Sequence, residues 1–279
     1  MKKLLMIAAM LLLPVAFIVL TIVHTNVLRT TQFTWQSRRV PPAFCGFRIV
    51  QLSDLHNARF GREQSRLIRA VAQAQPDLIA LTGDFIDHRT RSLAPVEELL
   101  EGIAPLAPIV FIDGNHDPRS DFYPALLELF AQHGVTVLQG EYGLWWHDID
   151  ESLRPVNMTV ERDGARLSIG GVHDFDADIV LLHDPSTFAY YAEGGRDGMF
   201  RSDGLVLAGH MHGGQVALPG GQAMIAPMDN GLSFFPPYSS GVYLNGDATM
   251  FLSRGLGTSH LPIRLFATPE VAVIELKAE

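Results

Sequence analysis

The 279-residue chain has a single cysteine, Cys45, so it can form no internal disulfide and has no Cys-x-x-Cys pair to hold zinc through thiolates. Basic residues are also few: 21 Lys and Arg stand against 30 Asp and Glu, which gives a formal net charge of −9. Proteins that bind nucleic acid by neutralising its phosphates usually have a basic face and a high pI. We therefore expect no nucleic-acid partner, and no internal repeat points to a solenoid.

Charge is absent from one long segment near the N-terminus, because Leu4–Val23 contains no Asp, Glu, Lys or Arg. About 20 helical residues at about 1.5 Å each span the roughly 30 Å of a bilayer core. The sequence therefore predicts a transmembrane anchor over residues 1–24. A cleaved signal peptide is the alternative, although no small-x-small cleavage site follows. Basic residues flank both ends, so the orientation stays open.

The composition after this segment favours one folded domain. Residues 25–43 are mostly polar and end in Pro41-Pro42, which predicts a juxtamembrane linker. The remaining residues, 44–279, belong to a chain that is 47% hydrophobic, enough to bury one sizeable core.

Within the domain, short apolar runs alternate with helix-spaced segments. Strands are predicted over residues 47–52, 78–81, 109–112, 179–182 and 205–208, and helices over residues 63–75, 96–102 and 123–132. Asp163-Gly164, between residues 157–162 and 166–172, predicts a hairpin, and further strands are expected over 241–253 and 271–276. The alternation is typical of an α/β fold.

Metal-capable side chains follow five of these strands. They are Asp54 with His56, Asp84 with Asp87, Asn115 with His116, His183, and His210 with His212. The crevice outside the carboxyl ends of the strands is the usual ligand site of open α/β sheets, so we expect these side chains to converge. Residues two apart in an extended segment point the same way, so each Asp-x-His or His-x-His pair can reach one ion.

The motifs Asp54-x-His56, Gly83-Asp84-x-x-Asp87, Gly114-Asn115-His116-Asp117, His183 and Gly209-His210-x-His212 resemble the calcineurin-like metallophosphoesterases in order and composition. Residues 209–215, 253–258 and 269–270 resemble the bacterial membrane-linked branch of that family. This branch includes UDP-2,3-diacylglucosamine hydrolases and less defined phosphodiesterases. The resemblance covers residues 44–276 and implies two mixed β-sheets in a sandwich flanked by helices.

The resemblance also implies two divalent metal ions and a role for each residue. Asp54, His56, Asp84 and His212 would hold one ion, and Asp84, Asn115, His183 and His210 the other. Ions about 3.5–4 Å apart lower the pKa of a shared water and stabilise in-line displacement at phosphorus. His116 would act as general acid and Asp87 would orient it. Oxygen and imidazole ligands suit manganese, our first choice, and also iron or zinc.

One departure from the family and three local alternatives stay open at this point. His88 follows Asp87, where relatives often have an arginine, so a phosphate contact from that arginine is in doubt. His173 also follows an apolar run and is a rival of His183. Residues 254–257 predict either a phosphate cradle or a simple turn. Residues 234–238 form either an apolar lip that meets lipid or an acyl chain, or a loop folded onto the domain.

The predicted activity is metal-dependent hydrolysis of a phosphodiester or pyrophosphate bond. UDP-2,3-diacylglucosamine, a nucleotide-lipid of lipid A biosynthesis, is the best specific substrate, and it requires a catalytic domain on the cytoplasmic side of a bacterial inner membrane. A broad-specificity membrane-linked phosphodiesterase and a catalytically silent membrane-tethered binding scaffold are the alternatives. The sequence does not determine the oligomeric state.

Overall fold

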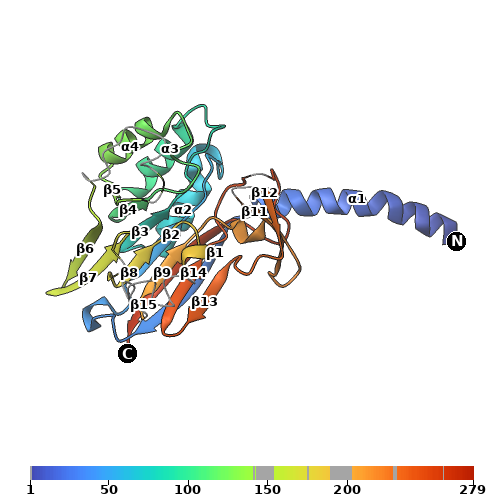
Figure 1. Ribbon diagram of the computed structural model, residues 1–279. Coiled ribbons are helices and arrows are strands. Elements are labelled where there is room, and N and C mark those ends of the chain that lie inside the picture. Colours follow the sequence, from blue (N-terminus) through green and yellow to red (C-terminus); the bar gives the residue numbers. More distant parts are fainter. Residues whose placement is uncertain are drawn as a thin grey trace.

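A computed structural model of the chain describes residues 2–140, 142, 154–174, 176–188, 203–228, 231–259 and 261–279 (Figure 1). The first sheet has the order β1 (Arg29–Ser37), β15 (Glu270–Ala278), β2 (Arg48–Leu52), β3 (Leu78–Thr82), β4 (Ile109–Ile112) and β5 (Thr136–Val137). The second has the order β13 (Gly241–Asn245), β14 (Ala248–Leu252), β9 (Leu205–Ala208), β8 (Ile179–Leu181), β7 (Ala165–Gly170) and β6 (Asn157–Arg162).

Both sheets are mixed. In the first, β15 pairs antiparallel with β2, whereas β2, β3 and β4 are parallel neighbours. In the second, the β13–β14 and β6–β7 pairs are antiparallel and β8 is parallel to β9. A third, small sheet comprises β10 (Val216–Ala217), β11 (Ala223–Met228) and β12 (Gly231–Phe234).

The sandwich has two hydrophobic cores, one between the two sheets and one between the first sheet and the helices. In β2, Ile49 contributes to the core shared with the second sheet, and the next residue, Val50, contributes to the core under the helices. This alternation is the period of a strand that is buried on both faces. The helices α2 (Ser65–Ala74), α3 (Ala94–Ile103) and α4 (Tyr123–Gln132) lie on the outer side of the first sheet (Figure 1). The α/β architecture of mixed sheets is therefore confirmed.

Most predicted elements occur within a residue or two of their expected bounds, and β4 and α4 have the predicted bounds. The first helix of the domain is an exception, because α2 begins at Ser65 and not at Glu63. Residues Glu63 and Gln64 have φ of 51° and 55°, which is the left-handed region, so the helix cannot start before them.

The predicted linker over residues 25–43 is wrong over residues 29–37. Arg29–Ser37 forms β1, which pairs in parallel with β15 along all nine of its residues. Trp35 from this strand is buried in the core between the sheets. The remaining side chains of β1 are mostly polar and exposed, as is common at a sheet edge, and this polarity concealed the strand in the sequence.

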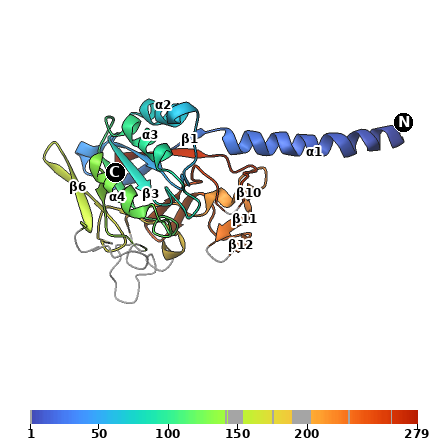
Figure 2. The same ribbon diagram turned by 90° about the horizontal axis from the view of Figure 1, so that it is seen from above.

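Helix α1 (Lys2–Asn26) extends away from the sheets (Figures 1 and 2). Its foot is attached to the domain, since Thr25 Oγ1 accepts a hydrogen bond from Arg264 N at 2.9 Å. Large apolar side chains between Leu12 and Val23 are exposed. Among the described residues, no helix reaches the length and apolar character that crossing a membrane requires.

Candidate metal centre

The predicted ligands meet at one end of the sandwich because five strands end there. Asp54, Asp84 and Asn115 follow β2, β3 and β4 of the first sheet, and His183 and His210 follow β8 and β9 of the second. The strands within each of these sets are parallel neighbours, so their carboxyl ends lie side by side. All seven predicted ligands are buried.

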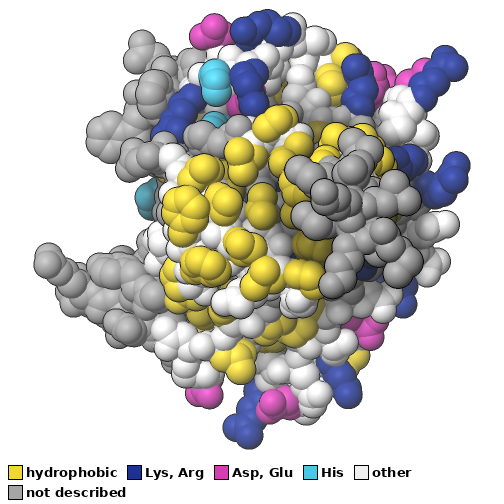
Figure 3. Space-filling model, turned by 90° about the vertical axis from the view of Figure 1, so that its right-hand side faces the viewer, with side chains coloured by type: hydrophobic (Ala, Val, Ile, Leu, Met, Phe, Trp, Pro, Cys, Tyr) yellow, Lys and Arg dark blue, Asp and Glu magenta, His cyan; other side chains and the backbone are white. Residues whose placement is uncertain are grey.

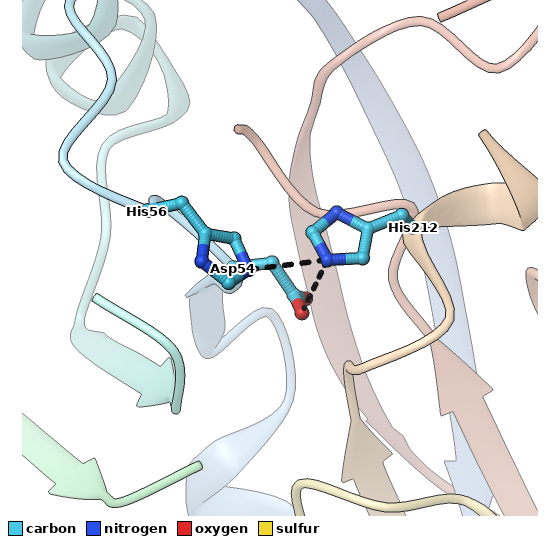
Figure 4. Close-up of side chains that lie close together, drawn as sticks. All are labelled: Asp54, His56 and His212. Carbon is cyan, nitrogen blue, oxygen red and sulfur yellow. Dashed lines mark hydrogen bonds and ion pairs between the residues drawn. The ribbon is translucent and has the colours of Figure 1, made fainter. Parts of the chain in front are cut away.

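Asp54, His56 and His212 form the first ligand group, with one ligand atom of each within 4.8 Å of the others. His212 Nε2 lies 3.2 Å from His56 Nε2 and 3.5 Å from Asp54 Oδ1, and the three side chains point toward one another (Figure 4). Neutral imidazole nitrogens this close can share one cation as ligands.

Asp84, His183 and His210 form the second group, again within 4.8 Å. Asn115 Oδ1 lies 3.1 Å from His183 Nε2 and 3.0 Å from His210 Nδ1, so the amide oxygen faces the same point. The structure thus brings together the four residues that the family resemblance implies for the second ion.

Asp84 connects the two groups. Its Oδ2 lies 3.2 Å from His183 Nε2 in the second group and 3.6 Å from His56 Nε2 in the first. This oxygen is buried and accepts no hydrogen bond from the described residues, although its partner Oδ1 accepts one from His116 N at 2.8 Å. A buried carboxylate oxygen without a hydrogen bond is costly unless a cation completes it. Asp84 Oδ2 is therefore placed to bridge two cations.

The sequence suggested that the ligands converge from extended backbone. The structure shows instead that they converge through strained turns. Asp54, His56, Asp84, His210 and His212 all have φ between 45° and 73°. Side chains other than Gly rarely adopt this left-handed region, and such residues cluster at functional sites where the surrounding structure maintains them. Asp54 and His56 reach the first ligand group in this way. His210 and His212 belong to different groups, so the expectation that the His-x-His pair reaches one ion is wrong.

Gly83 shows how tightly these turns approach one another. It has φ of +84°, and a Cβ atom added there would lie 2.6 Å from Gly114 N and 2.6 Å from His183 Nδ1. Any larger residue would push the β3 and β4 loops apart and displace His183. The glycine that precedes Asp84 is therefore a steric requirement of the site.

Asp117 holds the same two loops from behind. Its carboxylate accepts hydrogen bonds from the backbone N–H groups of Asp84, Phe85, Ile86 and Gly114 at 2.7–3.0 Å. Burial and the nearby Asp84 raise its pKa to about 7, and the backbone donors oppose that shift. This residue positions Asp84 without facing the centre itself.

The electrostatics of the centre favour positive charge. Burial opposes ionisation of Asp84, but His183, His116 and His56 hold the pKa of its carboxyl well below the usual value. Burial likewise disfavours the imidazolium of His183, but Asp84 and Asp54 raise its pKa well above the usual range. Protons on histidine thus compensate the carboxylates here, as divalent cations do in metal sites.

Two contacts orient the histidine rings. His183 Nδ1 lies 2.9 Å from the carbonyl oxygen of Thr82, so Nε2 is the nitrogen that faces the centre. Arg264 Nη2 lies 3.2 Å from His212 Nδ1, which leaves Nε2 of that ring toward Asp54. Metal-ligating histidines usually donate the N–H of the other ring nitrogen to an acceptor, as His183 can to the Thr82 carbonyl oxygen. A guanidinium only donates, so Arg264 packs against the His212 ring without accepting its N–H. Sequence reasoning missed Arg264, because no motif marks it.

His116 lies beside the first ligand group, with its ring centroid 5.2 Å from that of His56. It lines a hollow with His88, Arg89 and Ser259 at the edge of the site. Burial, and to a lesser extent the positive charges of His56 and His183, lower the pKa of His116 to about 4, although Asp84 opposes the shift.

Asp87 contacts His56, with its Oδ2 3.4 Å from His56 Nδ1. Its role in orienting His116 stays a prediction. Arg89 Nε donates to Asp87 Oδ2 at 3.0 Å, so an arginine reaches the site one position later than the relatives' motif would place it. Arg89 supplies a positive charge at the hollow. Such a charge had been in doubt because His88 stands where relatives often have an arginine.

Two of the open alternatives now have structural answers. His173 is exposed and outside both ligand groups, whereas His183 is inside the second. The N–H groups of Gly255, Leu256 and Gly257 donate to Ser253 Oγ and to the carbonyl oxygens of Ser53 and Asp54. Those donors are occupied within the protein, so residues 254–257 form a structural turn that supports Asp54.

Two adjacent groups of carboxylate, amide and imidazole side chains, joined by one carboxylate at the end of an α/β sandwich, could form a binuclear site and have the arrangement of a metallohydrolase. The donor set contains no sulfur and fits divalent cations that accept oxygen and nitrogen. The chain belongs to the calcineurin-like phosphoesterase family, whose model matches residues 47–214. It is accordingly a hydrolase that acts on phosphoester bonds.

Relatives in several organisms match most of the chain. The chain is 28% identical to "Uncharacterized metallophosphoesterase YkuE" of Bacillus subtilis, with 91% of this chain and 87% of the relative covered. It is 28% identical to "Phosphodiesterase YaeI" of Escherichia coli, with 82% of each covered. It is 24% identical to "Transmembrane protein with metallophosphoesterase domain" of Danio rerio, with 86% of this chain but 55% of the relative covered.

Proposed function

We propose that this chain hydrolyses a phosphodiester or pyrophosphate bond of a membrane-associated substrate, using two divalent cations held by Asp54, His56, Asp84, Asn115, His183, His210 and His212. The main support is the position of Asp84 Oδ2. This oxygen is buried, has no hydrogen bond within the described part of the chain, and lies within 3.6 Å of a histidine nitrogen from each group. A carboxylate in that position would be shared by the two ions. The name of the YaeI relative supports a phosphodiester as the substrate class.

The chain's own residues supply the remaining chemistry. Two cations in such a centre lower the pKa of water and stabilise in-line displacement at phosphorus. His116, at the edge of the hollow, is placed to hydrogen-bond the leaving oxygen, and it can donate a proton there once the negative charge of a bound phosphate raises its pKa. Four of the five guanidinium N–H groups of Arg89 donate to Asp87, Thr258 and Ser259, and the remaining one, on Nη1, can bind a phosphate oxygen at the same hollow.

The binding-scaffold alternative is less well supported. A protein that only bound a partner would need neither seven buried ligands in left-handed or tightly packed turns nor a histidine beside them. Such strain is retained where the geometry is used. We therefore favour turnover over a silent scaffold.

We also propose that α1 anchors the enzyme in a bacterial inner membrane as a single pass, although no helix of the described residues meets the length and apolar character of a membrane span. Two features support this: the uncharged run of residues 4–23 and the exposed apolar side chains between Leu12 and Val23. UDP-2,3-diacylglucosamine stays the specific substrate to test, and it requires the domain to face the cytoplasm. The names of two relatives give no specific substrate, so a phosphodiesterase of broad specificity is the alternative to test beside it.

The test uses the full chain in detergent, stripped with a chelator and then reloaded separately with manganese, iron or zinc. Each preparation is assayed on a chromogenic phosphodiester, a phosphomonoester and UDP-2,3-diacylglucosamine. We expect no turnover without metal, recovery with metal, and a preference for diester or pyrophosphate bonds. The identity of the ion that restores most activity decides between manganese and its alternatives.

Asp84→Asn is the decisive variant, because it removes the negative charge from the bridging position while keeping the side-chain size. We expect it to fold, to hold less metal by elemental analysis and to lose turnover. Asp121→Asn, at an exposed acidic residue, is the matched control. Full activity of the stripped wild-type protein, or of Asp84→Asn, would exclude the bimetal reaction.

A further inference from the structure

The small third sheet forms a lobe with almost no charge. The apolar lobe, defined here as residues 215–240, contains β10, β11, β12 and the loop that follows. Asp229 is the single charged residue among residues 213–246 of a chain that is 18% charged. Among its described residues, Leu218, Leu232, Phe234 and Phe235 are exposed, the two phenylalanines by 68% and 60%. Large apolar side chains grouped in this way mark a contact surface.

The lobe lies at the foot of α1. Val216 of β10 forms a bridge with Phe266, and the ring centroid of Phe266 lies 4.9 Å from that of His24 in α1. Figures 1 and 2 both show β11 and β12 at the end of the domain from which α1 leaves. Figure 3 views that face, where hydrophobic side chains gather across the middle and the charged side chains lie nearer the edges. The lobe and α1 therefore present one continuous apolar face.

The exposed side chains of α1 indicate what covers this face. Leu12, Leu13, Val15, Phe17, Ile18 and Val19 are all exposed by more than half. At 3.6 residues per turn these positions surround the whole helix. A second protein surface would cover one side of such a helix, whereas lipid surrounds it completely, and a helix that is apolar all round is typical of a membrane span.

Positive charge lies beside the same foot. Arg66 Nη2 donates to the carbonyl oxygen of Asn26, the last residue of α1, at 2.7 Å. Arg66 and Arg69 line a hollow there with Leu28 and Thr30. Arginines next to an apolar anchor attract anionic headgroups at a bilayer surface. The chain has a net charge of −9, so this local positive edge is contrary to its overall charge.

We propose that the apolar lobe inserts into the interfacial layer of an anionic bilayer, with Leu232, Phe234 and Phe235 among the acyl chains and Arg66 and Arg69 at the headgroups. The proposal rests on the membrane anchor of the proposed function and adds a second, separate contact. Its consequence for the site is direct, because the turn His212–Gly214 leads straight into β10. The metal centre then lies at the membrane surface, where the phosphoester of an amphiphilic substrate is located.

The test places nitroxide labels on the full chain in bilayer discs of phosphatidylcholine and phosphatidylglycerol. Cys45→Ser gives a background without cysteine, since Cys45 is the only one. Single cysteines are then introduced as Phe235→Cys in the lobe, Val15→Cys in α1 and Leu244→Cys as control. Leu244 is 72% exposed and lies in β13. The turn that follows β13 contains Asp247, which lines a hollow with Glu279, so this part of the strand lies beside the C-terminal residue.

We expect the labels at 15 and 235 to be shielded from a water-soluble nickel chelate and the label at 244 to remain accessible. Shielding at 15 with full accessibility at 235 would overturn the lobe contact while leaving the anchor intact. Accessibility at both positions would overturn the anchor and with it the lobe contact. Spin–spin broadening between labels at 235 on separate chains would show that a second copy covers the lobe, and would also contradict the proposal.

A kinetic experiment asks whether the contact serves the reaction. Phe234→Ser/Phe235→Ser should lower the rate several-fold on a phosphodiester carried by a diacylglycerol anchor in these bilayers. The rate on a soluble chromogenic phosphodiester should not change. Val242→Ser/Leu244→Ser removes two similarly exposed apolar side chains from β13 and should change neither rate. Equal rates of both pairs on the bilayer substrate would contradict a role for the lobe.

Discussion

Arg264 and His212 form a buried contact, with 3.2 Å between Arg264 Nη2 and His212 Nδ1. The guanidinium has no carboxylate partner among the described residues, and it donates instead to backbone carbonyls of His212, Arg254, Gly257 and Ala267. Burial lowers its pKa to about 10, so the group stays charged at neutral pH. Arg264 thus fixes both the ring and the backbone of one predicted ligand.

Arg264→Lys should weaken metal binding, because a lysine ammonium cannot reproduce the planar set of donors that fixes His212. Arg264 holds the loop of His212 through backbone carbonyl oxygens, and changes in contacts that support a metal ligand typically lower metal affinity by about 10–100-fold. Isothermal titration of the stripped protein with manganese measures the change. Arg254→Lys, near the same loop but bonded to Glu270, is the control. Unchanged affinity in folded Arg264→Lys would show that backbone contacts alone position the ring.

His116→Gln should separate proton donation from metal binding. A lost general acid typically lowers the rate by about 10²-fold or more on a substrate with a poor leaving group. The effect should be much smaller on a nitrophenyl ester, since nitrophenolate leaves without a proton. Steady-state kinetics with both substrates, together with elemental analysis for bound metal, provide the readout. An equal loss on both would assign His116 to a different step.

Asp117→Asn should destabilise the protein, because four backbone N–H donors converge on the two carboxylate oxygens. The asparagine amide has one acceptor oxygen, and its NH2 group would face N–H groups. Each buried donor without a partner costs about 1–3 kcal/mol, so we expect a loss of at least about 2 kcal/mol. Urea unfolding beside the Asp121→Asn control measures it. Equal stability of the two variants would mean that the loops hold without this carboxylate.

The pH dependence of the metal-free protein should include a contribution from His116. Its pKa falls from 6.5 to about 4 on folding, mainly through burial, so the unfolded chain binds the proton more readily within that window. The contribution of His116 to stability is therefore complete above pH 6.5 and is lost as the pH falls toward 4. When the pH is lowered from 7 to 5, the free energy of unfolding of His116→Gln should fall by about 1–2 kcal/mol less than that of the wild type. Parallel urea titrations at both pH values test the sign.

Arg89→Gln should mainly affect substrate binding. The guanidinium lies at the hollow that contains His116, and it contacts Asp87 and not a predicted ligand. Loss of one charge-assisted hydrogen bond to a phosphate oxygen corresponds to about a tenfold rise in KM. Arg91→Gln is the control, since Arg91 donates to the backbone carbonyls of His88 and Thr90. A fall in kcat without a change in KM would place Arg89 in the chemical step.

The sequence predicts well which strand ends meet, because the apolar strands that precede the predicted ligands can be recognised locally. A run such as 109–112 can be recognised from its own residues, and parallel strands deliver the residues after them to one edge. The same reasoning does not give the backbone at Asp54 or His212. Their left-handed conformations depend on loops from distant parts of the chain, which no local pattern records.

Two other features could not be found in the sequence for similar reasons. β1 is mostly polar, since an edge strand buries few side chains, and its partner β15 is far away in the chain. Arg264 acts through hydrogen bonds to backbone carbonyl groups. Every residue has such a group, so no residue type in the sequence marks the partners of Arg264. Tertiary contacts determine both.

The pairing of β1 with β15 has a consequence for biosynthesis. A ribosome makes β1 early, directly after α1, and makes its partner last among the strands described here. Until then, the new polypeptide has an open strand next to its apolar helix, with unpaired backbone groups on the edge that β15 will occupy. Premature termination just before β15 would leave that edge exposed, and such edges aggregate readily. Completion of the first sheet therefore waits until β15, the last of the described strands, has been synthesised.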